Sequence, residues 1–162
     1  MAKPITCADT ATVLALCITR RFTAPREAVF RAWTRPEELA QWFGPKDTTA
    51  RNVRTDPQPG GRYSLEMHEI DGIHRLSGIY REVEPPKRLV FTWAWDHGEI
   101  AGVEMLVAID FVETEDGGTL LTLTHERLPS QNARDLHEKG WIGTLDCLED
   151  YIAPQDQPTT PE

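Results

Sequence analysis

The sequence predicts a single α+β domain in which a curved antiparallel sheet wraps around a long C-terminal helix. Three observations support this fold class: two short helical patterns follow an N-terminal strand, several alternating segments come next, and the last segment returns to helical periodicity. A chain of 162 residues suits one ordinary domain with a sizeable core. No second domain is needed to account for it.

The N-terminal part predicts one strand and two short helices. Residues 12–22 are rich in β-branched and apolar side chains, which favour a strand. The pattern then changes to helical spacing, with Pro25 suited to a first helical turn. A second helix is expected to have Thr34 as its cap and Pro36 early in it, and to stop at a glycine-proline pair.

Alternating segments predict the rest of the sheet, for a total of about six or seven strands. Asp71 and Gly72 form a strong tight-turn dipeptide between two such segments. Residues 88–95 follow a proline-containing turn and place four large apolar side chains on one face. Residues 103–111 and 119–126 predict a further hairpin, because a glycine-rich turn separates them.

Residues 130–153 predict the long amphipathic helix, since their apolar residues recur with helical spacing. The domain is therefore expected to span residues 11–153. Residues 1–10 are expected to form a flexible N-terminus, and the polar, proline-rich residues 154–162 a disordered tail.

The apolar face that carries Trp93 and Trp95 needs a cover, and the long helix supplies one. Side chains two apart on a strand share a face, so the same inward parity can be followed along every strand. The resulting candidates for the lining of a cavity between sheet and helix are Tyr63, Leu65, Met67, His74, Leu76, Gly78, Tyr80, Phe91, Trp93, Trp95, Met105, Val107, Leu123, His125, His137, Trp141 and Leu145. Parity leaves open whether this interior is a cavity or a packed core.

Charge and hydropathy exclude several partners. The net charge of −9 would repel phosphate backbones and anionic lipid surfaces, so neither nucleic acid nor a membrane is an expected partner. The apolar segment at residues 13–18 is far shorter than the roughly 20 residues of a membrane helix. We therefore expect a cytoplasmic protein. Cys7, Cys17 and Cys147 lack metal-ligand spacing and are expected to be free thiols, the last two of them buried.

A few polar residues are candidates for chemistry inside the cavity. His74, His125 or Tyr80 would be the acid or base if catalysis occurs, although structural roles are the alternative for each. The group His68, Glu69, Asp71 and His74 contains metal-ligand types. Because it straddles a tight turn and its side chains should alternate between faces, no metal site and no cofactor is predicted. His97 and its acidic neighbours lie in a loop beyond Trp95, where they could line a cavity mouth or simply be solvated, and solvation is the default for loop charges.

Five stretches of the chain together form a specific pattern: RRFTAPREAVFRAWTRPEELAQWFGP, PGGRYSLEM, GIYREVEPPKRLVFTW, VAIDFVETEDGGTLLTLTHERLP and HEKGWIGTLDCLEDYI. In these stretches the chain resembles a known family, the homologues of the activator of heat-shock protein 90 ATPase, in the START-like (Bet v 1-like, or SRPBCC) superfamily. The resemblance implies a helix-grip fold with a cavity that holds lipids, sterols, hormones or polyketide intermediates in relatives. It does not carry over co-chaperone activity, because the eukaryotic activators resemble this domain joined to an upstream chaperone-binding domain.

Three functions are compatible with these observations. The first is binding of a hydrophobic or aromatic small molecule, lipid-like or polyketide-like, in the cavity. The second is a cyclase or dehydratase that uses a cavity histidine or tyrosine. The third is a stress-associated, co-chaperone-like module that binds a chaperone through its surface, and a homodimer is also compatible. We expect the first, and thus binding rather than catalysis.

Overall fold

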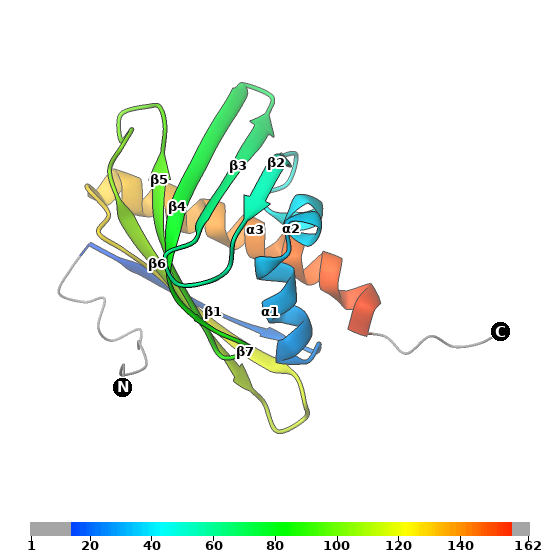
Figure 1. Ribbon diagram of the computed structural model, residues 1–162. Coiled ribbons are helices and arrows are strands. Elements are labelled where there is room, and N and C mark those ends of the chain that lie inside the picture. Colours follow the sequence, from blue (N-terminus) through cyan, green and yellow to red (C-terminus); the bar gives the residue numbers. More distant parts are fainter. Residues whose placement is uncertain (1–13, 157–162) are drawn as a thin grey trace.

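The computed structural model describes residues 14–156, with side chains for residues 14–153. The elements in chain order are β1 (Leu16–Phe22), α1 (Arg26–Thr34), α2 (Pro36–Trp42), β2 (Thr49–Thr55), β3 (Arg62–Glu69), β4 (Gly72–Glu84), β5 (Arg88–Trp95), β6 (Met105–Glu113), β7 (Thr119–Glu126) and α3 (Gln131–Asp156). The seven strands form one antiparallel sheet in the order β1-β7-β6-β5-β4-β3-β2. Figure 1 shows this sheet curving around α3, with α1 and α2 next to that helix. The predicted fold class is confirmed.

The two short helices form where the sequence predicts them, but the proposed cap of the second is wrong. Thr34 is the last residue of α1, and Arg35 precedes α2 without a side-chain cap. The Thr34 hydroxyl donates to the Phe30 carbonyl oxygen at 3.1 Å, because that carbonyl in the preceding turn is within its reach. Pro36 opens α2 as expected.

Gly78 permits the close approach of β4 to its neighbours. A Cβ atom there would lie 2.0 Å from the Thr92 carbonyl oxygen and 2.6 Å from the Tyr63 ring. The Tyr63 hydroxyl donates to the same Thr92 oxygen at 2.5 Å. The absence of a side chain at Gly78 therefore permits close packing of β3, β4 and β5. Gly78 was expected among the residues that line a cavity, but it is not one of the residues around the cavity described below.

The long helix covers the concave face of the sheet. Ser130 caps it, since its Oγ accepts a hydrogen bond from the Ala133 N–H at 3.1 Å. The helix runs to Asp156, past the expected end at residue 153. The expected flexible residues 1–10, and residues 157–162 of the expected tail, lie outside the described part of the chain. Within residues 14–156, no helix combines the length and apolarity needed to cross a bilayer.

The cysteines differ from expectation. Cys17 is disulfide-bonded, whereas Cys147 is free. Both are half-buried, not buried as expected. For Cys17 the reason is its place on β1, which lies at an edge of the sheet. Cys7 lies outside the described residues.

Candidate ligand-binding site

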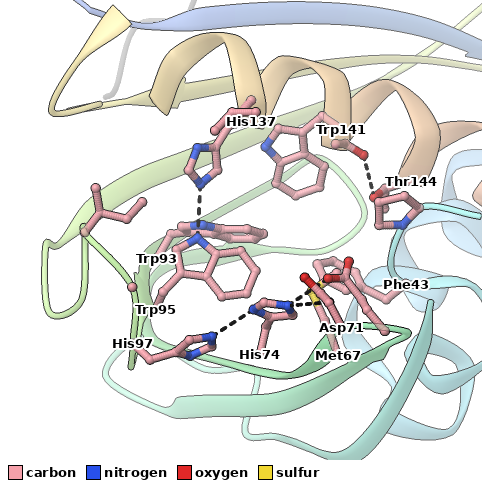
Figure 2. Close-up of a pocket in the computed structure, with 16 residues that line it drawn as sticks. Phe43, Met67, Asp71, His74, Trp93, Trp95, His97, His137, Trp141 and Thr144 are labelled. Atoms are coloured by element: carbon pink, nitrogen blue, oxygen red, sulfur yellow. Dashed lines mark hydrogen bonds and ion pairs between the residues drawn. The ribbon is translucent and has the colours of Figure 1, made fainter. Parts of the chain in front are cut away.

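A cavity of about 570 Å³ lies between α3 and the neighbouring ends of β3, β4 and β5. This volume is within the range of small-molecule sites in proteins. Figure 2 shows the aromatic side chains gathered around it. Its lining residues are Phe43, Pro45, Met67, Glu69, Asp71, His74, Trp93, Trp95, His97, Gly98, Ile100, Leu136, His137, Gly140, Trp141 and Thr144.

The wall of this cavity is a continuous aromatic cluster. Trp93 and Trp95 project from the same face of β5, with ring centroids 5.6 Å apart. Trp93 also lies 4.9 Å from Trp141 on α3. The contacts continue from Trp141 to Trp33 at 5.9 Å, and from Trp33 to Trp42 at 4.9 Å. All five tryptophans of the chain therefore form one chain of ring contacts, which begins at the cavity and ends in the core.

His137 is fixed in the cavity wall by two hydrogen bonds. Its Nε2 accepts from the Trp95 indole N–H at 3.1 Å, and its Nδ1 lies 2.7 Å from the Ala133 carbonyl oxygen. An indole can only donate and a carbonyl can only accept, so the ring is neutral with its hydrogen on Nδ1. Burial lowers the pKa of His137 below its ordinary value, in agreement with a neutral ring.

His125 lies behind the cavity wall. It is fully buried, and its Nδ1 accepts a hydrogen bond from the Trp141 indole N–H at 3.0 Å. The remaining nitrogen, Nε2, has no hydrogen-bond partner among the described residues. Burial, and then the neighbouring His137, hold the pKa of His125 well below its ordinary value. His125 points inward as predicted, but it is not among the residues that line the cavity.

The opposite rim of the cavity is polar and acidic. His74 Nε2 lies 2.8 Å from a Glu69 carboxylate oxygen and 3.2 Å from an Asp71 oxygen. His74 Nδ1 lies 2.8 Å from His97 Nε2, and His97 Nδ1 lies 2.8 Å from an Asp96 oxygen. Figure 2 shows His97, His74 and Asp71 in a row along this rim. The site thus joins an aromatic wall to an edge of imidazoles and carboxylates.

The sequence-predicted lining residues fall into three groups. Met67, His74, Trp93, Trp95, His137 and Trp141 line the cavity. Tyr63, Leu65, Tyr80 and Phe91 line a separate space of only about 20 Å³, which shares Phe43 and Trp93 with the main cavity. Leu76, Met105, Val107, Leu123 and Leu145 are buried in the core, together with His125.

The core residues were misplaced for a physical reason. Met105, Val107 and Leu123 lie on β6 and β7, and Phe30 of α1 packs on β6 with its ring 5.2 Å from that of Phe111. Helix α1 therefore covers part of the concave face at β6. The alternation along each strand predicted correctly which face these side chains share. It did not predict at which part of the sheet the cavity opens.

Several lining residues were missed by sequence reasoning. Leu136, Gly140 and Thr144 share a helix face with His137 and Trp141, so helical spacing was a usable signal for them. Phe43 and Ile100 lie outside regular strands and helices, and local sequence offered no signal for them. His97 is exposed, and of its two expected places it takes the one at the cavity mouth, where it pairs with His74.

The fold and the cavity define a START-like protein of the helix-grip class. Residues 23–153 match the profile of the family described as activator of Hsp90 ATPase homolog 1-like protein. The chain belongs to this family. No curated protein matches the chain.

Solved structures of bacterial proteins share the fold over most of their length. A protein from Nitrosomonas europaea is 30% identical, with a TM-score of 0.73 over 87% of this chain and 95% of that one. An AHSA1 protein from Silicibacter pomeroyi is 27% identical, with a TM-score of 0.78 over 87% and 99% of the two chains. A protein from Chromobacterium violaceum is 26% identical, with a TM-score of 0.78 over 85% and 96%.

Proposed function

We propose that the protein binds a hydrophobic or aromatic small molecule in the cavity between β3–β5 and α3. The observation that carries this proposal is an aromatic-walled space of about 570 Å³. A packed core would leave no such space, because protein interiors are filled to the density of organic crystals. The START-like fold, which commonly holds hydrophobic ligands, supports the same function.

The composition of the lining suggests how such a molecule would lie. Trp93, Trp95 and Trp141 offer flat apolar surfaces on which a planar ring system would stack. The polar part of the ligand would face Glu69 and His74, since a site of this kind uses a few polar groups to fix orientation. The preferred ligand would be flat and mostly apolar, with one polar end.

A substitution at Gly140 tests the proposal sharply. Gly140 lines the cavity, and a Cβ atom there would have no heavy atom within 4 Å, so Gly140→Phe should fill the space without disturbing the fold. Ile142→Phe is the matched control, because Ile142 is an exposed residue of the same helix that does not line the cavity. We expect an apolar fluorescent dye to bind the protein and the control, and to bind Gly140→Phe at least tenfold more weakly.

The result that would contradict the proposal is equal dye binding by all three proteins, or no binding by any. Native mass spectrometry of the freshly purified protein gives the ligand itself. A reproducible extra mass that disappears in Gly140→Phe supports the proposal and begins to identify the chemistry.

The two other hypotheses have less support. For a cyclase or dehydratase, His125 is behind the wall and Tyr80 lines only the small space, which leaves His74 as the one predicted acid or base at the cavity. The description of the family concerns activation of a chaperone ATPase. Retention of the protein by a chaperone middle domain, together with no dye binding, would favour a protein-interaction role instead.

A further inference from the structure

Three potential metal ligands converge on the cavity face of the β3–β4 hairpin. The ligand atoms of Glu69, Asp71 and His74 all lie within 4.8 Å of one another. The register pairs Met67 with His74, so His74 shares the face of Met67, Glu69 and Asp71. These side chains were expected to alternate between the two faces of the hairpin. Only His68 lies on the other face, where it pairs with Glu66.

The separations already approach those of a metal site. Tetrahedral ligands about 2.0 Å from zinc lie roughly 3.3 Å from one another. His74 Nε2 is 2.8 Å from Glu69 Oε2 and 3.2 Å from Asp71 Oδ1. Both carboxylates are partly exposed, with exposed fractions of 32% and 68%, so a small outward movement suffices to admit an ion.

A second layer of side chains orients the histidine. His74 Nδ1 contacts His97 Nε2, and His97 Nδ1 contacts Asp96. Neither His97 nor Asp96 is one of the three ligands. Without an ion, His74 Nε2 carries a hydrogen toward Glu69 and Asp71, because carboxylates only accept. Once an ion displaces that hydrogen, His74 can donate from Nδ1 to His97, and His97 can donate to Asp96. Histidines that bind metals are held in this way by partners on their other nitrogen.

We propose that Glu69, Asp71 and His74 form a binding site for a divalent transition-metal ion of the zinc type, at the rim of the cavity. An imidazole ligand favours zinc and its neighbours over magnesium and calcium, which prefer oxygen ligands. Three protein ligands leave one position of a tetrahedral ion open. All three ligands line the cavity, so the ion would lie at its rim, where Figure 2 shows Asp71 and His74, with the open position available to a cavity ligand.

The position of the site indicates a class of ligand for the cavity. An oxygen or nitrogen donor on a flat apolar molecule would complete the coordination of the ion while its ring system contacts the tryptophans. This last step rests on the proposed function, whereas the metal site itself does not.

Isothermal titration of the metal-stripped, full-length protein with zinc chloride tests the site. We expect one ion per chain, and at least tenfold weaker binding in each of His74→Asn, Glu69→Gln and Asp71→Asn. His68→Asn is the matched control, since His68 lies on the other face of the same hairpin, and it should bind zinc like the parent. His97→Asn removes only the positioning partner and should weaken binding by about tenfold.

Cobalt(II) adds a spectroscopic check because Cys147 is a free thiol. A site of one nitrogen and two oxygen ligands gives visible ligand-field bands without a thiolate charge-transfer band. The proposal is overturned by the absence of stoichiometric uptake, by uptake that survives His74→Asn, or by a thiolate band. The variant Gly140→Phe distinguishes the two proposals, since it should bind the dye at least tenfold more weakly yet still bind zinc like the parent.

Discussion

Two pairs of histidines lie close to the cavity, and they differ in what surrounds them. His137 in the wall and His125 directly behind it, here called the wall pair, have ring centroids 4.9 Å apart, and tryptophan indoles donate to both rings. His74 and His97 have centroids 4.8 Å apart at the rim, where carboxylates accept from them. The spacing of the two pairs is nearly the same, but the wall pair is surrounded by donors and apolar rings and the rim pair by acceptors.

The comparison shows that the neighbours of a histidine decide its use. An indole N–H occupies the acceptor nitrogen of each wall histidine, which leaves that nitrogen unable to take a proton or a metal ion. At the rim, the carboxylates beside His74 Nε2 attract a cation, which can take the place of the hydrogen on that nitrogen. The wall pair therefore has a structural role, whereas the rim pair is suited to binding.

The largest expected effect is at the wall. Trp141 is buried and donates to His125, so Trp141→Ala creates a cavity and removes a hydrogen bond. We expect the free energy of unfolding to fall by about 3–5 kcal/mol, measured by urea denaturation. Trp141→Phe keeps most of the packing and should cost clearly less. A loss below about 1 kcal/mol in Trp141→Ala would contradict a tightly packed wall.

The second-largest effect is expected in the pH dependence of stability, to which His125 and His137 both contribute. The folded-state pKa values of His125 and His137 are both lowered, so the unfolded chain takes up protons that the folded protein does not. Their contribution to stability is fully present above the unfolded pKa of about 6.5 and is lost as pH falls below it. We expect up to about 1.4 kcal/mol per pH unit for each ring, measured by urea denaturation between pH 7 and 5.

His125→Leu provides the control for this pH dependence. The variant lacks one of the two rings, and the slope of stability against pH should become shallower. An unchanged slope would show that His125 does not titrate between the folded and unfolded states.

A smaller effect is expected where the wall reaches the cavity. Trp95→Phe removes the indole N–H that His137 Nε2 accepts, while an aromatic ring remains. Because Trp95 and His137 are only half-buried, water replaces the lost donor and the free energy of unfolding should fall by about 1 kcal/mol. Thermal unfolding of the parent and of Trp95→Phe measures this loss. A loss as large as that in Trp141→Ala would contradict the expected difference between the buried Trp141 and the half-buried Trp95.

The smallest effect on stability is expected at the rim. Asp71→Asn changes an exposed carboxylate whose pKa is lowered by its hydrogen bond with His74. Exposed ion pairs contribute little to stability, so Tm should stay within experimental error of the parent value. A clear drop in Tm would give the rim a structural role like that of the wall.

The wall was largely predictable from sequence, and the rim was not. Strand parity placed Trp93 and Trp95 on one face, and helical spacing placed His137 beside Trp141. Parity does not report how deep a residue lies, which is why His125 was expected at the cavity. The rim depends on the register across the Asp71-Gly72 turn, which strand parity alone did not give, and on the end of β5 bringing His97 to His74, a contact that is not local in sequence.

The ring contacts that join all five tryptophans have an optical consequence. Indoles this close exchange excitation energy, so light absorbed by Trp42 in the core can be emitted or quenched at Trp95 beside the cavity. The intrinsic emission of the protein therefore comes from a linked set of tryptophans and not from five independent ones. A quencher that contacts the cavity end alone should dim the whole spectrum, which gives the molecule a built-in reporter of occupancy without any label.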